Sequence, residues 1–242
     1  MRGKFLILAI PICLVLITSL AWGEDLLSQG LAAQNAGKNA EAVALLGKYL
    51  KDHPDSAEAR RSLAQALNAL DRRTEALEEL NRCLAAFPKD TGLLLAQGKM
   101  LAEMERRQEA IASFGKILAL DPKNVEALKE RGENLAQEGR FEEALKDYDQ
   151  AAALAPKDPW LFQKRGMAFF CMGKYQEAVA EFTTAIRLAP DSPLFYFFRA
   201  QIRLLHLNQK DKAVADLQEG CRLGHSLCCR ELEKMEIKPI KK

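Results

Sequence analysis

The sequence has few histidines and almost no excess charge of either sign. Three histidines occur among 242 residues, and the 35 Lys and Arg residues nearly balance the 33 Asp and Glu residues, for a formal net charge of +2. Nucleic-acid-binding chains usually carry a basic excess that neutralises phosphate, so this balance argues against nucleic acid as a partner. The 14 glycines and 9 prolines are too few for a collagen-like chain, and a hydrophobic content of 48% is too high for a disordered one. These absences leave a folded chain of one or two units.

Groups that could carry catalysis are also scarce. The three histidines, His53, His206 and His225, lie on separate elements of the sequence. The chain lacks a phosphate-binding glycine loop, a Walker motif and a serine elbow, whereas an active site needs acid, base, nucleophile or metal groups that converge. We therefore predict a protein that is not an enzyme and that holds no cofactor.

Residues 1–23 have the layout of a secretory signal peptide. Arg2 and Lys4 precede an apolar run over residues 5–20, and small residues follow that run. The best processing site would leave Glu24 as the new N-terminus. Loss of the two basic residues would also leave the mature chain formally neutral, with 33 basic and 33 acidic residues.

The alternative is an uncleaved membrane anchor within residues 5–22. The apolar run of sixteen residues is interrupted by Pro11, and it is short against the roughly 20 residues that span a bilayer, so cleavage is favoured. In either case we expect the remainder to be exported, to the periplasm or out of the cell.

A period of 34 residues runs through the rest of the chain. Five prolines recur at this interval, namely Pro54, Pro88, Pro122, Pro156 and Pro190. Five alanines do the same, namely Ala42, Ala76, Ala110, Ala144 and Ala178. A third column holds only small residues, namely Gly30, Ala64, Gly98, Gly132, Gly166 and Ala200. Small side chains let two helix backbones approach closely, and a proline cannot continue a helix, so the period predicts packed helix pairs.

Helix starts and stops fall on the same period. Two residues after each proline stands a side chain that can cap a helix N-terminus, namely Ser56, Asp90, Asn124, Asp158 or Ser192. Pro159 and Pro193 then occupy a first helical position, where the missing N–H has no consequence. Gly37, Gly139 and Gly173 fall midway through their periods, at the place of a helix stop. Each period is therefore predicted to be a helix hairpin.

This pattern resembles the tetratricopeptide repeat, which has the same period and the same alanine, aromatic and proline positions. The aromatic of the second helix is present as Phe114, Tyr148 and Phe182. The resemblance implies an all-α, right-handed superhelical solenoid of six helix-turn-helix hairpins with a C-terminal capping helix. The expected repeats are residues 24–56, 57–90, 91–124, 125–158, 159–192 and 193–226, the last with a one-residue insertion, followed by a capping helix and basic tail over 227–242.

The resemblance also implies where a partner would bind. In this family the first helix of each repeat lines the concave face. Repeats two and four offer ordinary charged positions there, whereas repeats five and six offer apolar ones. The candidate partner-binding residues are Trp160, Gln163, Lys164, Met167, Phe170, Leu194, Phe197, Phe198 and Gln201.

Aromatic side chains crowd these two repeats beyond what one or two apolar stripes require. The crowded residues are Trp160, Phe162, Phe169, Phe170, Phe195, Tyr196, Phe197 and Phe198. One interpretation is that neighbouring repeats and the capping helix cover them. The other is a docking groove for an apolar peptide segment or for a second copy of the chain.

Three cysteines and a histidine gather near the C-terminal end, namely Cys221, His225, Cys228 and Cys229. A structural disulfide from Cys221 to Cys228 or Cys229 would suit an oxidising compartment. Buried free thiols are the second interpretation. A metal site is the third, and it is disfavoured because no paired Cys-x-x-Cys spacing is present. We therefore predict that these residues bind no metal.

The function predicted from these observations is a non-catalytic scaffold or adaptor of the cell envelope that binds a protein or peptide in the concave groove. The alternatives are a metal- or redox-linked module that uses the cysteine cluster, and a self-associating structural protein.

Overall fold

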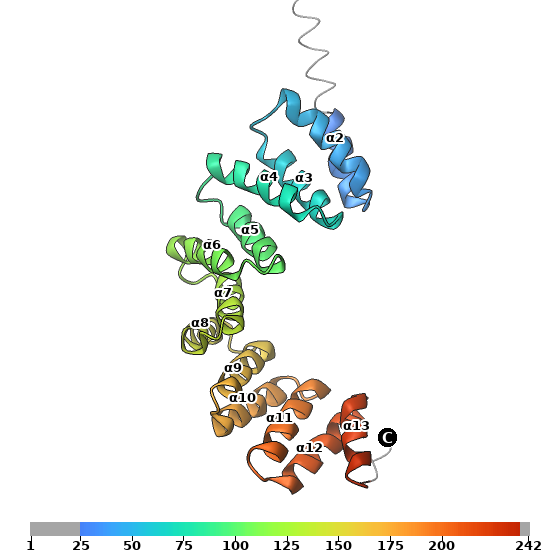
Figure 1. Ribbon diagram of the computed structural model, residues 1–242, viewed down its shortest axis with the longest axis vertical. Helices are drawn as coiled ribbons and strands as arrows, with labels where there is room; N and C mark the ends of the chain where they lie inside the picture. Colours follow the sequence, from blue (N-terminus) through green and yellow to red (C-terminus); the bar gives the residue numbers. More distant parts are fainter. Residues whose placement is uncertain (1–24, 238–242) are drawn as a thin grey trace, which may run out of the picture. The chain divides into compact units, whose positions relative to one another are not determined.

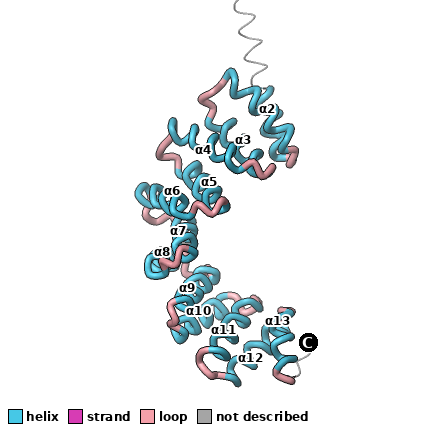
Figure 2. The backbone as a smooth tube through the Cα atoms, viewed as in Figure 1, coloured by secondary structure: helices cyan, strands magenta, loops and turns pink. Residues whose placement is uncertain are grey.

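Helices are the only regular elements within residues 25–237, the part of the chain that the computed structural model describes (Figure 2). The described chain forms two compact units that divide between Met104 and Glu105. The predicted all-α fold is confirmed. The predicted signal segment lies outside the described residues, as does the end of the basic tail.

The first unit contains helical residues 25–35 and four further helices (Figure 1). These are α2 (Asn39–Asp52), α3 (Ala57–Ala69), α4 (Arg73–Ala86) and α5 (Thr91–Glu103). From α2 to α5, each helix packs against the next one along the chain.

The second unit contains eight helices among its described residues. These are α6 (Arg107–Leu120), α7 (Val125–Gln137), α8 (Phe141–Leu154), α9 (Pro159–Cys171), α10 (Tyr175–Leu188), α11 (Pro193–Leu205), α12 (Lys210–Arg222) and α13 (Ser226–Lys234). Neighbours in sequence are again neighbours in space, and α7 also contacts α9, so the first helices of repeats four and five lie side by side.

Local capping explains why the first helix of each repeat begins where it does. The side chains of Ser56, Asp90, Asn124 and Asp158 each accept a hydrogen bond from a backbone N–H in the following turn, as predicted. The prediction is wrong for Ser192, whose side chain makes no such bond. The helix there begins with Pro193, whose ring already fixes a helical φ.

Left-handed residues end the first helix of several repeats. Gly37, Gly139 and Gly173 have φ of 72°, 75° and 73°, which confirms the predicted stops. Repeats two and three place Asp71 and Glu105 in the same region, with φ of 61° and 59°. The turn geometry is therefore kept even where glycine is absent.

The core consists of the small-residue columns together with the large residues that face them. All five alanines of the Ala42 column are fully buried, which agrees with their predicted role in close helix packing. The largest fully buried side chains include Phe114, Tyr148 and Phe182, the three aromatics of the repeat pattern. The capping helix is present as α13, and Lys234 and Glu236 are exposed, as expected for the water-facing side of a cap.

Within residues 25–237, no helix has the length and apolar character that crossing a membrane requires.

Candidate functional site

A pocket of about 300 Å³ lies between the first helices of repeats four and five. Its walls come from α7 and α9, and α8 supplies two aromatic side chains. The lining residues are Glu133, Ala136, Gln137, Phe141, Tyr148, Gln163, Lys164, Met167, Ala168 and Cys171. We refer to this pocket as the apolar pocket, because Ala136, Phe141, Met167 and Ala168 are among its lining residues.

A second pocket of about 150 Å³ adjoins it. Glu133, Tyr148 and Lys164 line both pockets, so the two form one groove along α7 and α9. The remaining lining residues of the second pocket are Glu126, Lys129, Glu130 and Trp160. Trp160 is 49% exposed. Its ring makes an edge-on contact with Phe195, with 5.1 Å between the ring centroids. An indole left half in water beside a pocket is a common feature of binding surfaces.

Tyr148 lies at the floor of this groove, opposite Gly132 of α7, which has no side chain. A Cβ placed on Gly132 would lie 2.7 Å from the Tyr148 ring, so only glycine permits the ring to lie there. Burial raises the pKa of the Tyr148 phenol well above its usual range, with a smaller contribution from the nearby Glu133 carboxylate. The phenol is therefore neutral at physiological pH, and its ring, which is only 1% exposed, closes the inner side of the groove.

Two ion pairs lie at the rim of the groove and connect α7 with α9 and its N-cap residue. Lys164 Nζ lies 2.7 Å from Glu133 Oε1, and Lys129 Nζ lies 3.0 Å from Asp158 Oδ2. All four side chains remain about a quarter to two fifths exposed, and ion pairs with that exposure contribute only about 0–1 kcal/mol to stability. Such pairs can therefore be exchanged for contacts with a partner at small cost.

Four of the nine predicted partner-binding residues line this groove, namely Trp160, Gln163, Lys164 and Met167. The other five line neither pocket of the groove, namely Phe170, Leu194, Phe197, Phe198 and Gln201. Four of the five predicted residues of repeat five thus meet in the groove, whereas Phe170 and the repeat-six residues line neither of its pockets.

The repeat-six aromatics are used in packing. Phe198 lies 5.6 Å from Phe182, and Phe197 lies 5.0 Å from His225, in each case between ring centroids. Phe170 is also partly buried, in contact with Tyr175 and His206. Neighbouring repeats therefore cover much of the aromatic crowding, as the first of the two interpretations expects.

Repeat four contributes more to the groove than its charged sequence predicts. The charged positions predicted for its first helix, which are Glu126, Lys129, Glu130 and Glu133, line the groove. Tyr148, which the sequence assigns to the repeat pattern, lines it as well. The sequence does contain a signal for this position of Tyr148. Gly132 on the first helix and an aromatic residue on the second helix of the same repeat indicate that a large ring lies beneath α7.

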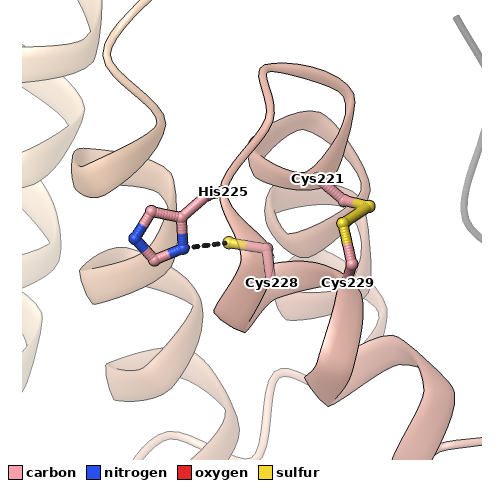
Figure 3. Close-up of a disulfide and its surroundings, with 4 residues drawn as sticks. All are labelled: Cys221, His225, Cys228 and Cys229. Carbon is pink, nitrogen blue, oxygen red and sulfur yellow. Dashed lines mark hydrogen bonds between the residues drawn. A yellow bond between two sulfur atoms is a disulfide. The ribbon is translucent and has the colours of Figure 1, made fainter.

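The C-terminal cysteines fall into two separate groups (Figure 3). Cys221 and Cys229 form a disulfide with 4.9 Å between their Cα atoms. Cys228 is a buried free thiol, and its Sγ lies 3.5 Å from His225 Nδ1. Burial raises the pKa of the Cys228 thiol to about 11. Of the two candidate partners for Cys221, the structure therefore selects Cys229 and leaves Cys228 unpaired.

Nowhere in residues 25–237 do three or more His, Cys, Asp or Glu side chains stand in an arrangement that suits a metal ion. The disulfide takes two of the sulfurs that the metal hypothesis requires, and Figure 3 shows Cys228 and His225 directed away from that disulfide.

Family comparison identifies the class of protein. Models of the tetratricopeptide repeat match residues 27–91, 95–159 and 135–203. These matches cover well over half of the sequence, so the chain belongs to the tetratricopeptide repeat family, and its fold is consistent with a protein-interaction scaffold.

Solved structures with the same fold include MamA from Desulfovibrio magneticus RS-1. That structure is 22% identical to this chain, has a TM-score of 0.66, and is matched over 71% of this chain and 97% of its own length. A tetratricopeptide repeat protein from Parabacteroides merdae ATCC 43184 is also 22% identical, with a TM-score of 0.61 over 88% of this chain and 83% of its own length. Identities this low show the tetratricopeptide solenoid fold and no more. A search of curated proteins found no match.

Proposed function

We propose that this protein is an exported, non-catalytic scaffold that binds a segment of another protein in the groove between α7 and α9. The family supports protein binding in general. The groove adds a location, because it combines an exposed indole, an apolar pocket and exchangeable ion pairs on adjacent first helices.

The size of the apolar pocket favours a protein segment as its occupant. At about 300 Å³ it is at the lower limit of small-molecule sites, which run from roughly 300 to 1,000 Å³. A hollow of this size accommodates one large apolar side chain of a docked segment. The rest of that segment would lie along Trp160 and the charged rim.

Export is supported by two observations of different kinds. The layout of residues 1–23 is that of a signal peptide. The disulfide between Cys221 and Cys229 is of the kind that persists in oxidising compartments and is rare in the cytosol. We infer that the chain acts in the periplasm or outside the cell. Cell fractionation and the N-terminal mass of the purified protein test this, and a cytosolic protein that starts at Met1 would contradict it.

Site-specific crosslinking in cells tests the groove. A photoreactive phenylalanine derivative at Met167, inside the apolar pocket, should give one discrete crosslinked product. Leu205 is the matched control, because it is an apolar residue that is 66% exposed and lines neither pocket of the groove. The same probe at Leu205 should not give that product.

The product at Met167 must also depend on the groove itself. We expect Trp160→Ala to abolish it without lowering the amount of folded protein, because the indole supplies the largest exposed apolar surface beside the pocket. Equal products from Met167 and Leu205, or a product unaffected by Trp160→Ala, would contradict the proposal. A product with twice the mass of the chain would identify a second copy as the occupant.

A further inference from the structure

The capping helix α13 is too short to be stable by itself. It has nine residues, whereas isolated helices shorter than about 12–15 residues are marginal in water. Its buried side chains, Cys228 and Leu232, complete an apolar cluster with Ala213 and Leu217 of α12. The ordering of α13 therefore depends on what holds it against α12.

The packing of α13 on α12 is close but small in area. A Cβ placed on Gly220 would lie 2.5 Å from Cys228 Sγ, so the sulfur fits only because that position is glycine. Apart from Cys228 and Leu232, no residue of α13 is buried. Met235 and Ile237, which follow the helix, pack partly buried against the same cluster. Two buried and two partly buried side chains are a small attachment for a whole helix.

The disulfide supplies a second attachment at a different place. Cys221 is in the last turn of α12 and Cys229 is in the first turn of α13, so the bond closes a short loop across the turn between the helices. Figure 3 shows this bond on one side of α13 and Cys228, directed toward His225, on another. Both bonded cysteines are partly exposed, which leaves the bond open to a dissolved reductant.

We propose that the Cys221–Cys229 disulfide is a redox-sensitive latch that holds α13 over the apolar end of repeat six. A dithiol reductant opens it by thiol–disulfide exchange. One thiolate attacks a sulfur of the disulfide, and the second thiol of the reductant then releases the protein from the mixed disulfide. The protein gains two electrons and two protons as two thiols, and the reductant becomes a cyclic disulfide. α13 then detaches locally, and Cys228 and Leu217 become accessible to solvent.

This inference goes beyond the proposed function, because it concerns the state of the C-terminal end and does not depend on any occupant of the groove. Its effect is local. The helices α7 and α9 share no bond with the disulfide, so we expect their groove to keep its structure in both redox states.

The chain contains its own reporters for a test. Its described part has three free cysteines: Cys171 is exposed, Cys83 is buried in repeat two, and Cys228 is buried under the cap. Each alkylation rate is measured by mass spectrometry on the full chain, before reduction and after reduction with dithiothreitol followed by its removal. Alkylation of Cys221 and Cys229 reports that reduction was complete.

The expected result is that reduction accelerates alkylation of Cys228 by at least about tenfold, since a disulfide in a short loop commonly contributes more than that factor to the closed state. The rates at Cys83 and Cys171 should stay unchanged. If Cys228 stays as protected as before, packing alone holds the cap and the latch is refuted. If Cys83 accelerates equally, the opening is global and the latch is equally refuted.

A double variant, Cys221→Ser with Cys229→Ser, separates the bond from the reductant. It should show the fast Cys228 rate without any reductant, and dithiothreitol should not change that rate. A slow Cys228 rate in this variant would overturn the proposal.

Discussion

Repeats four and five close their helix pairs differently from the C-terminal end of the chain. In repeats four and five, a glycine of the first helix faces an aromatic ring of the second, with Gly132 against Tyr148 and Gly166 against Phe182. In repeat six, Ala200 and Leu217 share one buried cluster, to which the cap adds further apolar side chains. The same two positions of the 34-residue period thus hold a glycine and an aromatic ring in repeats four and five, and an alanine and a leucine in repeat six.

The difference shows how one repeat pattern can serve two purposes. The ring of Tyr148 fills the space beneath Gly132 of α7, and residues of α7 and α9 line the groove above it. At the C-terminal end, Phe197 packs against His225 and Phe198 packs against Phe182, so both rings contribute to packing between neighbouring elements. The proposed binding groove and the end cap are therefore built from different repeats, although aromatic residues are crowded across both.

Removal of one buried ring should have the largest effect. Phe182 is fully buried, so Phe182→Ala is expected to lower the free energy of unfolding by about 3–5 kcal/mol through lost burial and the cavity left behind. Leu217→Ala removes the corresponding side chain of repeat six and should cost less, because fewer buried atoms are lost. Urea unfolding of both variants measures the comparison, and an equal or larger loss for Leu217→Ala would overturn it.

The contact between Gly132 and the Tyr148 ring can also be disrupted by changing the glycine. Gly132→Ala places a methyl group 2.7 Å from a rigid ring, and overpacking of this kind typically costs about 1–3 kcal/mol. Tyr148→Leu in the same chain should restore much of the loss, because the pair would then match Ala64 and Leu80 of repeat two.

The control for this prediction is Gly47→Ala. Gly47 lies within α2, and a Cβ there meets no atom within 4 Å. Alanine is the better helix former by about 1 kcal/mol, so this variant should gain stability. If Gly132→Ala is also neutral or stabilising, the close approach of α7 to the Tyr148 ring is not a constraint.

The turns of the two regions should respond with opposite sign. Gly139 of repeat four has φ of 75°, so Gly139→Ala should cost about 1 kcal/mol. Asn208 of repeat six has φ of 51° without being glycine, so Asn208→Gly should gain up to about 1 kcal/mol or leave stability unchanged. Thermal unfolding of the two variants gives the signs, and a stabilising Gly139→Ala would show that the turn does not require glycine.

Most of the fold could be predicted because its signals are local. Ser56 and Asp90 cap helices through bonds within three residues, and Gly139 stops a helix by its own backbone conformation. A period of 34 residues then repeats each local signal, so errors at one repeat, such as the cap expected at Ser192, do not change the architecture.

The candidate site was predicted only in part because it depends on tertiary packing. Periodicity places Trp160 and Phe197 on equivalent faces, but only the packed structure shows that Phe197 is covered by His225. Which of Cys228 and Cys229 bonds with Cys221 also depends on tertiary packing. The two residues are adjacent, and the gap above Gly220 decides which sulfur is buried in the core and which is left to bond with Cys221.

Trp160→Ala should have a small effect on stability and a large effect on binding. The indole is half exposed and makes one edge-on contact with Phe195, and such aromatic pairs contribute about 0.5–1.5 kcal/mol beyond their buried area. We therefore expect a loss of unfolding free energy that is smaller than for the fully buried Phe182. Affinity for the protein crosslinked at Met167 should fall by at least about thirtyfold, the effect of losing a hot-spot residue worth about 2 kcal/mol.

Leu205→Ala is the matched control for that prediction, because it removes an apolar side chain that is even more exposed and lies outside both pockets. It should leave the affinity within about twofold, since surface substitutions away from such contacts change free energies by roughly 0.5 kcal/mol or less. Binding measured by titration calorimetry, with unfolding followed in parallel, separates the two residues. If both variants bind equally well, the groove of repeats four and five is a packing feature and not a binding site. The proposed contrast between a binding region in these repeats and a sealed C-terminal end would then be wrong.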